Sequence, residues 1–198
     1  DQETPESVNV GQHAQVILDS GKNPHFATDN TINATSYAES ANGVENATAT
    51  LVLPALSVIN SVKVITPFTD TSIWYNYEVF VSEDNQTWES VGKNELQQNA
   101  GESGYMITFA PKQARYVQIK GISSNDTQLK LVEVAVYGYY TNILLGKPTT
   151  GSHHRSTASK YQVTNIVDGD PSNTVYWDTG DVAKDGWANT SEEARPYA

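Results

Sequence analysis

Aromatic and short polar side chains gather in three turn-rich segments, residues 20–26, 66–76 and 123–128. A flat ring can stack on the C–H face of a pyranose, while amides, carboxylates and imidazoles can bind its hydroxyls. These residue types suit a sugar-binding site. The segments contain Lys22, Asn23, His25 and Phe26, then Phe68, Asp70, Trp74 and Asn76, and finally Asn125 and Asp126. From these we take five residues as the candidate sugar-binding set: Asn23, His25, Phe68, Trp74 and Asn76.

A structural interpretation of the same residues stays open. Phe68 and Trp74 would then pack into their own loop, and His25 would simply be solvated. Two neighbouring histidines, His153 and His154, invite a metal-binding interpretation. Adjacent side chains on an extended segment point to opposite faces, so this pair favours a surface loop instead.

Catalytic patterns are missing from the sequence. It has no cysteine, no Gly-x-Ser-x-Gly, no His-Glu-x-x-His and no phosphate-binding glycine loop. Glycoside hydrolysis needs two carboxylates about 5–10 Å apart in a cleft, whereas the acidic residues here fall mainly in turns and tails. We therefore predict that the chain is not an enzyme.

Charge excludes further classes of partner. Twelve basic residues against 23 acidic ones give a net charge of −11, which disfavours nucleic acid and polybasic membrane contacts. No apolar run approaches the roughly 20 residues of a membrane-spanning helix, so we expect no membrane insertion. Because the chain begins with Asp1 rather than Met, we expect a processed product or a fragment.

The segments between the turns alternate apolar and polar residues, as half-buried strands do. No stretch reads as an amphipathic helix. Because strands recur about every 10–15 residues, we predict an all-β fold, an eight-stranded antiparallel β-sandwich whose loops converge at one end. Strands are expected near residues 8–18, 47–53, 60–65, 77–82, 88–91, 105–109, 115–121 and 129–137.

An internal echo indicates two modules. Residues 166–176 repeat the pattern of residues 27–37 at an offset of 139, which aligns Asp168 with Asp29 and Tyr176 with Tyr37. A repeat at domain length is typical of tandem modules. We predict a disordered lead-in over residues 1–7, a complete sandwich over 8–140, and a truncated second copy over 141–198.

Three segments resemble signatures of the coagulation factor 5/8 type C (discoidin) superfamily, and within it of carbohydrate-binding module family 32. They are residues 77–88, 114–119 and 131–138. The resemblance implies a jelly-roll-like sandwich of the galactose-binding-domain type. Most such relatives bind glycans as appendages of secreted glycoside hydrolases. The resemblance also assigns four matching residues to the core: Tyr77, Trp88, Arg115 and Tyr116.

The resemblance further implies a structural Ca²⁺ beneath the loops, held by hard oxygen ligands. Four residues stand at the matching places: Asp29, Thr31, Thr35 and Glu133. The alternative is that Asp29 forms a hydrogen-bonded Asx turn without a metal.

The expected function is thus non-catalytic binding of a glycan, the terminal sugar of a glycoconjugate or polysaccharide. The chain would act outside the cell or on its surface, as a monomeric module of a longer protein. Two alternatives stay open: a protein-interaction, adhesion or spacer module with no sugar site in the first copy, or sugar binding by the second copy alone. The second arises because Thr66-Pro67-Phe68 stands where many sugar-binding members place an arginine.

Overall fold

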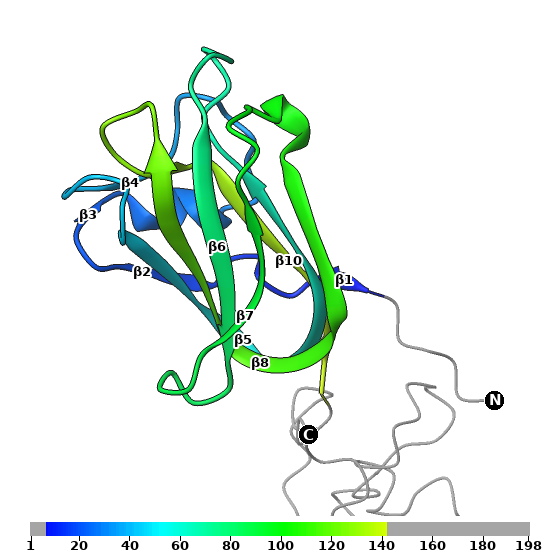
Figure 1. Ribbon diagram of the computed structural model, residues 1–198. Helices are drawn as coiled ribbons and strands as arrows, with labels where there is room; N and C mark the ends of the chain where they lie inside the picture. The colour runs from blue at the N-terminus through cyan, green and yellow to red at the C-terminus, as the bar shows by residue number, and fades with distance from the viewer. Residues whose placement is uncertain (1–6, 142–198) are drawn as a thin grey trace, which may run out of the picture. The chain divides into compact units, whose positions relative to one another are not determined.

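Ten β-strands and two short 3-10 helices form residues 7–141, the part of the chain that this computed structural model describes (Figure 1). All strand pairs are antiparallel, which confirms the predicted all-β class. Within this described part, no helix has the length and apolarity to cross a membrane. The elements are β1 (Val8–Asn9), β2 (Gln15–Leu18), β3 (Gly21–Lys22), η1 (Pro24–Thr28), β4 (Ala38–Ser40), β5 (Thr48–Ile65), β6 (Tyr75–Ser82), β7 (Glu89–Asn94), η2 (Gly101–Ser103), β8 (Tyr105–Ser124), β9 (Lys130–Leu131) and β10 (Glu133–Tyr140).

Two strands are longer than the sequence predicts. The separate strands expected at 47–53 and 60–65 form one strand, β5, and those at 105–109 and 115–121 form β8. The expected break near Pro54 is instead a shift in the β5–β8 register between Val52 and Ser57. Proline lacks an N–H group, so an irregular, exposed position in a strand accommodates it without ending the strand.

These two long strands pass from one layer of the sandwich to the other. Residues 48–52 of β5 pair with β2 and with the second half of β8, which also pairs with β6. Residues 57–65 of β5 pair with β10 and with the first half of β8. Strands that bend between layers form the corners of such sandwiches. A separate small sheet has the order β3–β4–β9.

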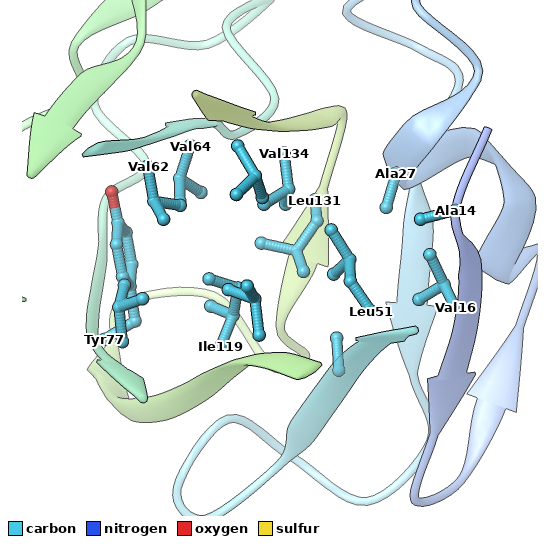
Figure 2. Packing of buried hydrophobic residues seen from close by; sticks show 14 of the residues in the cluster. Ala14, Val16, Ala27, Leu51, Val62, Val64, Tyr77, Ile119, Leu131 and Val134 are labelled. Atoms are coloured by element: carbon cyan, nitrogen blue, oxygen red, sulfur yellow. The ribbon is translucent and has the colours of Figure 1, made fainter. Parts of the chain in front are cut away.

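Apolar side chains fill the space between the layers (Figure 2). Val62, Val64 and Val134 lie on one side, and Ile119 and Leu51 lie on the other, all at most 2% exposed. Leu131, 1% exposed, lies between them. Burial on this scale is the main stabilising term of the fold.

Of the four residues assigned to the core by resemblance, only Tyr77 is fully buried. It shares the inner face of β6 with Val79 and Val81, as their alternation predicts. Trp88, Arg115 and Tyr116 are half-buried. Arg115 donates a hydrogen bond to the carbonyl of Pro54 at 2.8 Å, so it supports the bend of β5 from outside the core.

The turn-rich segment after β2 is more structured than expected. Asn23 has left-handed backbone geometry, with φ of 56°, and η1 follows it directly. Ala27 of η1 is fully buried near Ala14 and Val16 (Figure 2), which anchors the start of the loop at residues 29–37. The predicted second module lies outside the described residues apart from Thr141, and it stays a prediction.

Candidate functional site

Three loops surround a groove of about 230 Å³ at one end of the sandwich. They are residues 29–37 before β4, 66–74 between β5 and β6, and 125–129 between β8 and β9. The pairing of Tyr75 with Ser124 brings the second and third loops to the same end. A cavity slightly below the roughly 300 Å³ of typical ligand sites suits one small ring. The groove is lined by Ala34, Thr35, Tyr37, Pro67, Thr69, Asp70, Ile73, Tyr75, Asp126 and Lys130.

Side-chain amides hold the loop of residues 66–74 from two directions. Asn125 accepts a hydrogen bond from the Trp74 N–H and donates one to the Ser72 carbonyl, both at 2.9 Å. Asn99 donates to the carbonyls of Pro67 and Ile73 at 2.8 and 2.7 Å. A loop fixed before a ligand arrives loses less entropy on binding.

We expect Asn99→Ala to lower the free energy of unfolding by about 1–2 kcal/mol, since three hydrogen bonds are lost. Besides its two donated bonds, Asn99 accepts one from the Gly101 N–H at 2.8 Å. Urea denaturation of the full chain measures the change. The matched control is Asn42→Ala, which removes an exposed amide that bonds to Ser20. Equal stability of the two variants would show that Asn99 does not hold the loop.

Asp126 joins the groove's charged groups. Its Oδ2 accepts hydrogen bonds from the Tyr75 hydroxyl and from the Lys130 ammonium, the latter at 2.9 Å. Its Oδ1 accepts one from the Thr127 N–H at 2.7 Å. The Asp126 and Lys130 side chains are each only 18% exposed, so this pair is held largely away from water.

Mutual attraction keeps both partners ionised. Burial by itself would raise the pKa of Asp126, but the hydrogen bonds from Tyr75 and Lys130 outweigh burial and lower it. Burial by itself would lower the pKa of Lys130, but Asp126 outweighs burial and raises it. The pKa of Tyr75 rises, mainly through burial and then through its bond to Asp126. At neutral pH the network is therefore an ion pair with a neutral phenol.

Tyr37 and Asp70 complete the groove. The Lys130 Nζ lies 5.5 Å from the centre of the Tyr37 ring, within cation–π range. Asp70 is exposed, and its Oδ1 accepts hydrogen bonds from the Ser72 hydroxyl and N–H at 2.6 and 2.9 Å. The groove thus combines an aromatic ring with carboxylate acceptors and an ammonium donor, the groups that sugar recognition uses.

The five predicted sugar-binding residues are not gathered in this groove. Phe68 and Trp74 are half-buried on the loop that borders it, but neither lines it. Asn76 is 5% exposed, and it donates to the Ser123 hydroxyl and accepts from the Gln97 N–H, each at 3.2 Å. Its amide therefore links β6 to β8 and to the segment that follows β7.

Asn23 and His25 lie at a different place. His25 lines a second cavity, of about 480 Å³, together with His13, Gln15 and Asp29. Its ring centre is 4.3 Å from that of Phe26. Asn23, whose side chain makes no cap hydrogen bond, precedes η1 and lines neither cavity.

Sequence reasoning did not select four of the groove residues, Tyr37, Asp70, Asp126 and Lys130. Asp70 and Asp126 stand in the segments singled out for their polar residues. Tyr37 had a signal of its own, since it recurs as Tyr176 in the internal echo. No comparable pattern marks Lys130.

The residues expected to hold Ca²⁺ fall into two groups. Glu133 is 4% exposed, its Oε2 accepts a hydrogen bond from the Asn30 N–H at 3.2 Å, and its Oε1 has no partner among the described residues. Burial, followed by the charge of Asp29, raises the pKa of Glu133 to about 7. A buried carboxylate oxygen without a partner, beside a second carboxylate, fits a hard cation.

The two threonines are less informative. Asp29 Oδ1 accepts a hydrogen bond from the Thr31 N–H at 2.8 Å, so the Asx turn of the alternative interpretation is present. The Thr35 hydroxyl donates to Asn33 at 2.9 Å, and both threonines are exposed. Within residues 7–141, no group of three or more His, Cys, Asp or Glu side chains could hold a metal, so hydroxyl or carbonyl oxygens would have to supply further ligands.

Comparison with known proteins gives a family match. A family model described as F5/8 type C domain matches residues 9–134. No curated protein sequence matches the chain.

Several solved structures share the fold. A family 89 glycoside hydrolase from Clostridium perfringens is similar over 77% of this chain, with 18% identity and a TM-score of 0.59, and the chain spans only 17% of that enzyme. A chitosan-binding module of a chitosanase/glucanase from Paenibacillus sp. IK-5 covers 66% of this chain and 98% of its own, with 24% identity and a TM-score of 0.53. The CBM32 module of CpGH89 from Clostridium perfringens covers 66% and 99%, with 16% identity and a TM-score of 0.52.

Proposed function

Because the chain belongs to the F5/8 type C domain family, we propose that its described domain is a non-catalytic carbohydrate-binding module whose groove beside Tyr37 holds one sugar unit of a glycan. The observation that carries this proposal is the groove itself, which places an aromatic ring, two carboxylates and an ammonium around space for a small ring. The structures of similar fold support it, because one is a chitosan-binding module and another is in complex with GalNAc-β-1,3-galactose.

Recognition divides among the lining residues. The Tyr37 ring stacks on the C–H face of the sugar, and Asp70 accepts hydrogen bonds from its hydroxyls. Lys130 donates one hydrogen bond to Asp126 and has further N–H groups for the ligand. The ties from Asn99 and Asn125 keep these groups in place before binding.

The two carboxylates in the groove are poorly suited to glycoside hydrolysis. Such a reaction needs one carboxyl group that stays protonated near neutral pH to act as the general acid. Hydrogen bonds from Ser72 hold the pKa of Asp70 below its usual range, and that of Asp126 is also lowered. Neither group keeps a proton to donate, which supports binding without catalysis.

We expect Tyr37→Ala to weaken glycan binding by about 1–2 kcal/mol, or roughly tenfold, with little effect on stability. A glycan array on the full chain identifies the ligand, and isothermal titration measures the affinity. The control is Tyr116→Ala, a half-buried tyrosine that pairs with Ser82 at the opposite end of the β6–β8 ladder. Equal affinities of wild type and Tyr37→Ala would remove the groove from the binding site.

The proposal extends to a Ca²⁺ held by Asp29 and Glu133, with oxygens of Thr31 or Thr35 as further candidate ligands. The ion would supply positive charge that stabilises the turn after η1 and neutralises the buried carboxylate. Glu133 is the first residue of β10 and pairs with Ile65 of β5, so its carboxylate would link the core sheet to the loop of residues 29–37.

The longer protein is also part of the proposal. Similarity to a segment of a family 89 glycoside hydrolase supports a role as an appendage of a secreted hydrolase, a monomeric module that acts outside the cell. The gene on both sides of this segment tests the idea. A hydrolase domain and a secretion signal are expected, and their absence from the whole gene would contradict it.

A further inference from the structure

The groove carries one negative charge more than it carries positive charges, and Asp70 is the source of the surplus. Asp126 and Lys130 balance each other across 2.9 Å. Asp70 forms none of the salt bridges found in residues 7–141. Its Oδ1 accepts both hydrogen bonds from Ser72. Its Oδ2 accepts no hydrogen bond from residues 7–141 and can bind a ligand.

The single positive charge of Lys130 already offsets Asp126, so its remaining N–H groups can serve neutral hydroxyls but cannot also neutralise an acidic ligand. A sugar carboxylate that took its ammonium would leave Asp126 largely buried and without its cation, which is costly. Glu39, itself ion-paired with Lys22 at 3.1 Å, adds a further negative charge close enough to raise the pKa of Lys130. The net charge of −11 for the whole chain acts in the same direction.

We infer that the groove selects its sugar by charge: it favours amino sugars with a free ammonium over their neutral N-acetyl forms, and it excludes uronic acids. This inference rests on the proposed glycan-binding function. The ammonium of an amino sugar would pair with the free Oδ2 of Asp70, whereas a uronate would meet the same oxygen as a like charge. A neutral sugar would have neither the attraction of the ammonium nor the repulsion of the carboxylate.

Isothermal titration of the full chain with three tetrasaccharides tests this selection. They are built from glucosamine, N-acetylglucosamine and galacturonic acid, and the titration is run near pH 6 so that the amine is charged. We expect the glucosamine ligand to bind about fivefold more tightly than its N-acetyl form, with the difference shrinking as salt is added. The galacturonate ligand is expected to show no binding.

Two variants assign the effect to Asp70. Asp70→Asn keeps the size of the side chain and an oxygen acceptor for Ser72 but removes the charge, so it should reduce the fivefold preference to none. Asp19→Asn is the matched control, because Asp19 is another exposed aspartate that accepts a backbone N–H, that of Ser20 at 2.7 Å. This control should keep the full preference.

The outcomes separate this inference from the proposed function. Binding of galacturonate, or equal affinity for the glucosamine and N-acetylglucosamine ligands, would overturn the charge selection. The proposed glycan site would still stand if binding of any of these ligands depended on Tyr37. Glucosamine affinity that is unchanged in Tyr37→Ala would reflect the overall charge of the surface, and it would overturn the selection as well. Failure of all three ligands and of the glycan array would overturn both proposals.

Discussion

Asp126→Ala is expected to lower the free energy of unfolding by about 2–3 kcal/mol and to abolish sugar binding. The substitution removes the acceptor of the Tyr75 hydroxyl, whose residue is 2% exposed, and the counter-ion of Lys130. A buried hydroxyl and a largely buried ammonium would then lack partners in the folded state. Because the same carboxylate fixes two groove residues, stability and binding are expected to fall together.

Urea denaturation and isothermal titration of the full chain measure these two effects. Asp126→Asn gives a graded comparison, because the amide can still accept a bond from Tyr75 but cannot neutralise Lys130, so its stability should lie between those of wild type and Asp126→Ala. Asp19→Ala serves as the control for loss of an exposed carboxylate. The account is contradicted if Asp126→Ala and Asp19→Ala are equally stable.

The second large effect is a dependence of stability on pH and on Ca²⁺ through Glu133. The folded-state pKa of this carboxyl is raised from 4.5 to about 7 by burial and by the charge of Asp29. As the pH rises, the unfolded chain releases this proton at a lower pH than the folded chain does. Without metal, the stabilisation of the folded state by the protonated carboxyl is therefore complete below about pH 4.5. It is lost progressively as the pH rises to about 7, by up to about 3 kcal/mol.

Glu133→Gln should flatten this pH dependence between pH 4.5 and 7, because the amide does not titrate in that range. In the wild type, Ca²⁺ at about 100 times its dissociation constant should restore about 2.7 kcal/mol at neutral pH, since it binds the folded state alone. Urea denaturation with Ca²⁺ and with a chelator measures both effects. Identical unfolding curves under the two conditions would exclude the cation site.

Local patterns in the sequence account for much of the fold. Alternation identifies the inner face of β6, where Tyr77, Val79 and Val81 are all buried. It does not show whether a proline ends a strand or occupies a bend. At Pro54 the pairing of β5 with β8 continues on both sides, because partners more than 50 residues away hold the strand together. That contact is non-local, so the continuity of β5 was not visible in its own segment.

The candidate site shows the same limit. Two of the three predicted loops, residues 66–76 and 123–128, do border one groove, but the predicted loop of residues 20–26 does not, and residues 29–37 take its place. The side chains that face the groove depend on contacts between loops. Trp74 is positioned by Asn125, which comes 51 residues later in the sequence. Lys130 lines the groove because Asp126 pairs with it beside Tyr37. His25 follows the left-handed turn at Asn23 and therefore joins His13 at the second cavity.

The most direct test of the central claim maps the bound sugar on the full chain by NMR, using amide chemical shifts during titration with a glycan from the array. If the groove beside Tyr37 is the binding site, the largest shifts should fall in residues 34–37, 66–75 and 125–130. Shifts confined to the cavity of His13 and His25, or their absence throughout the domain, would contradict the account.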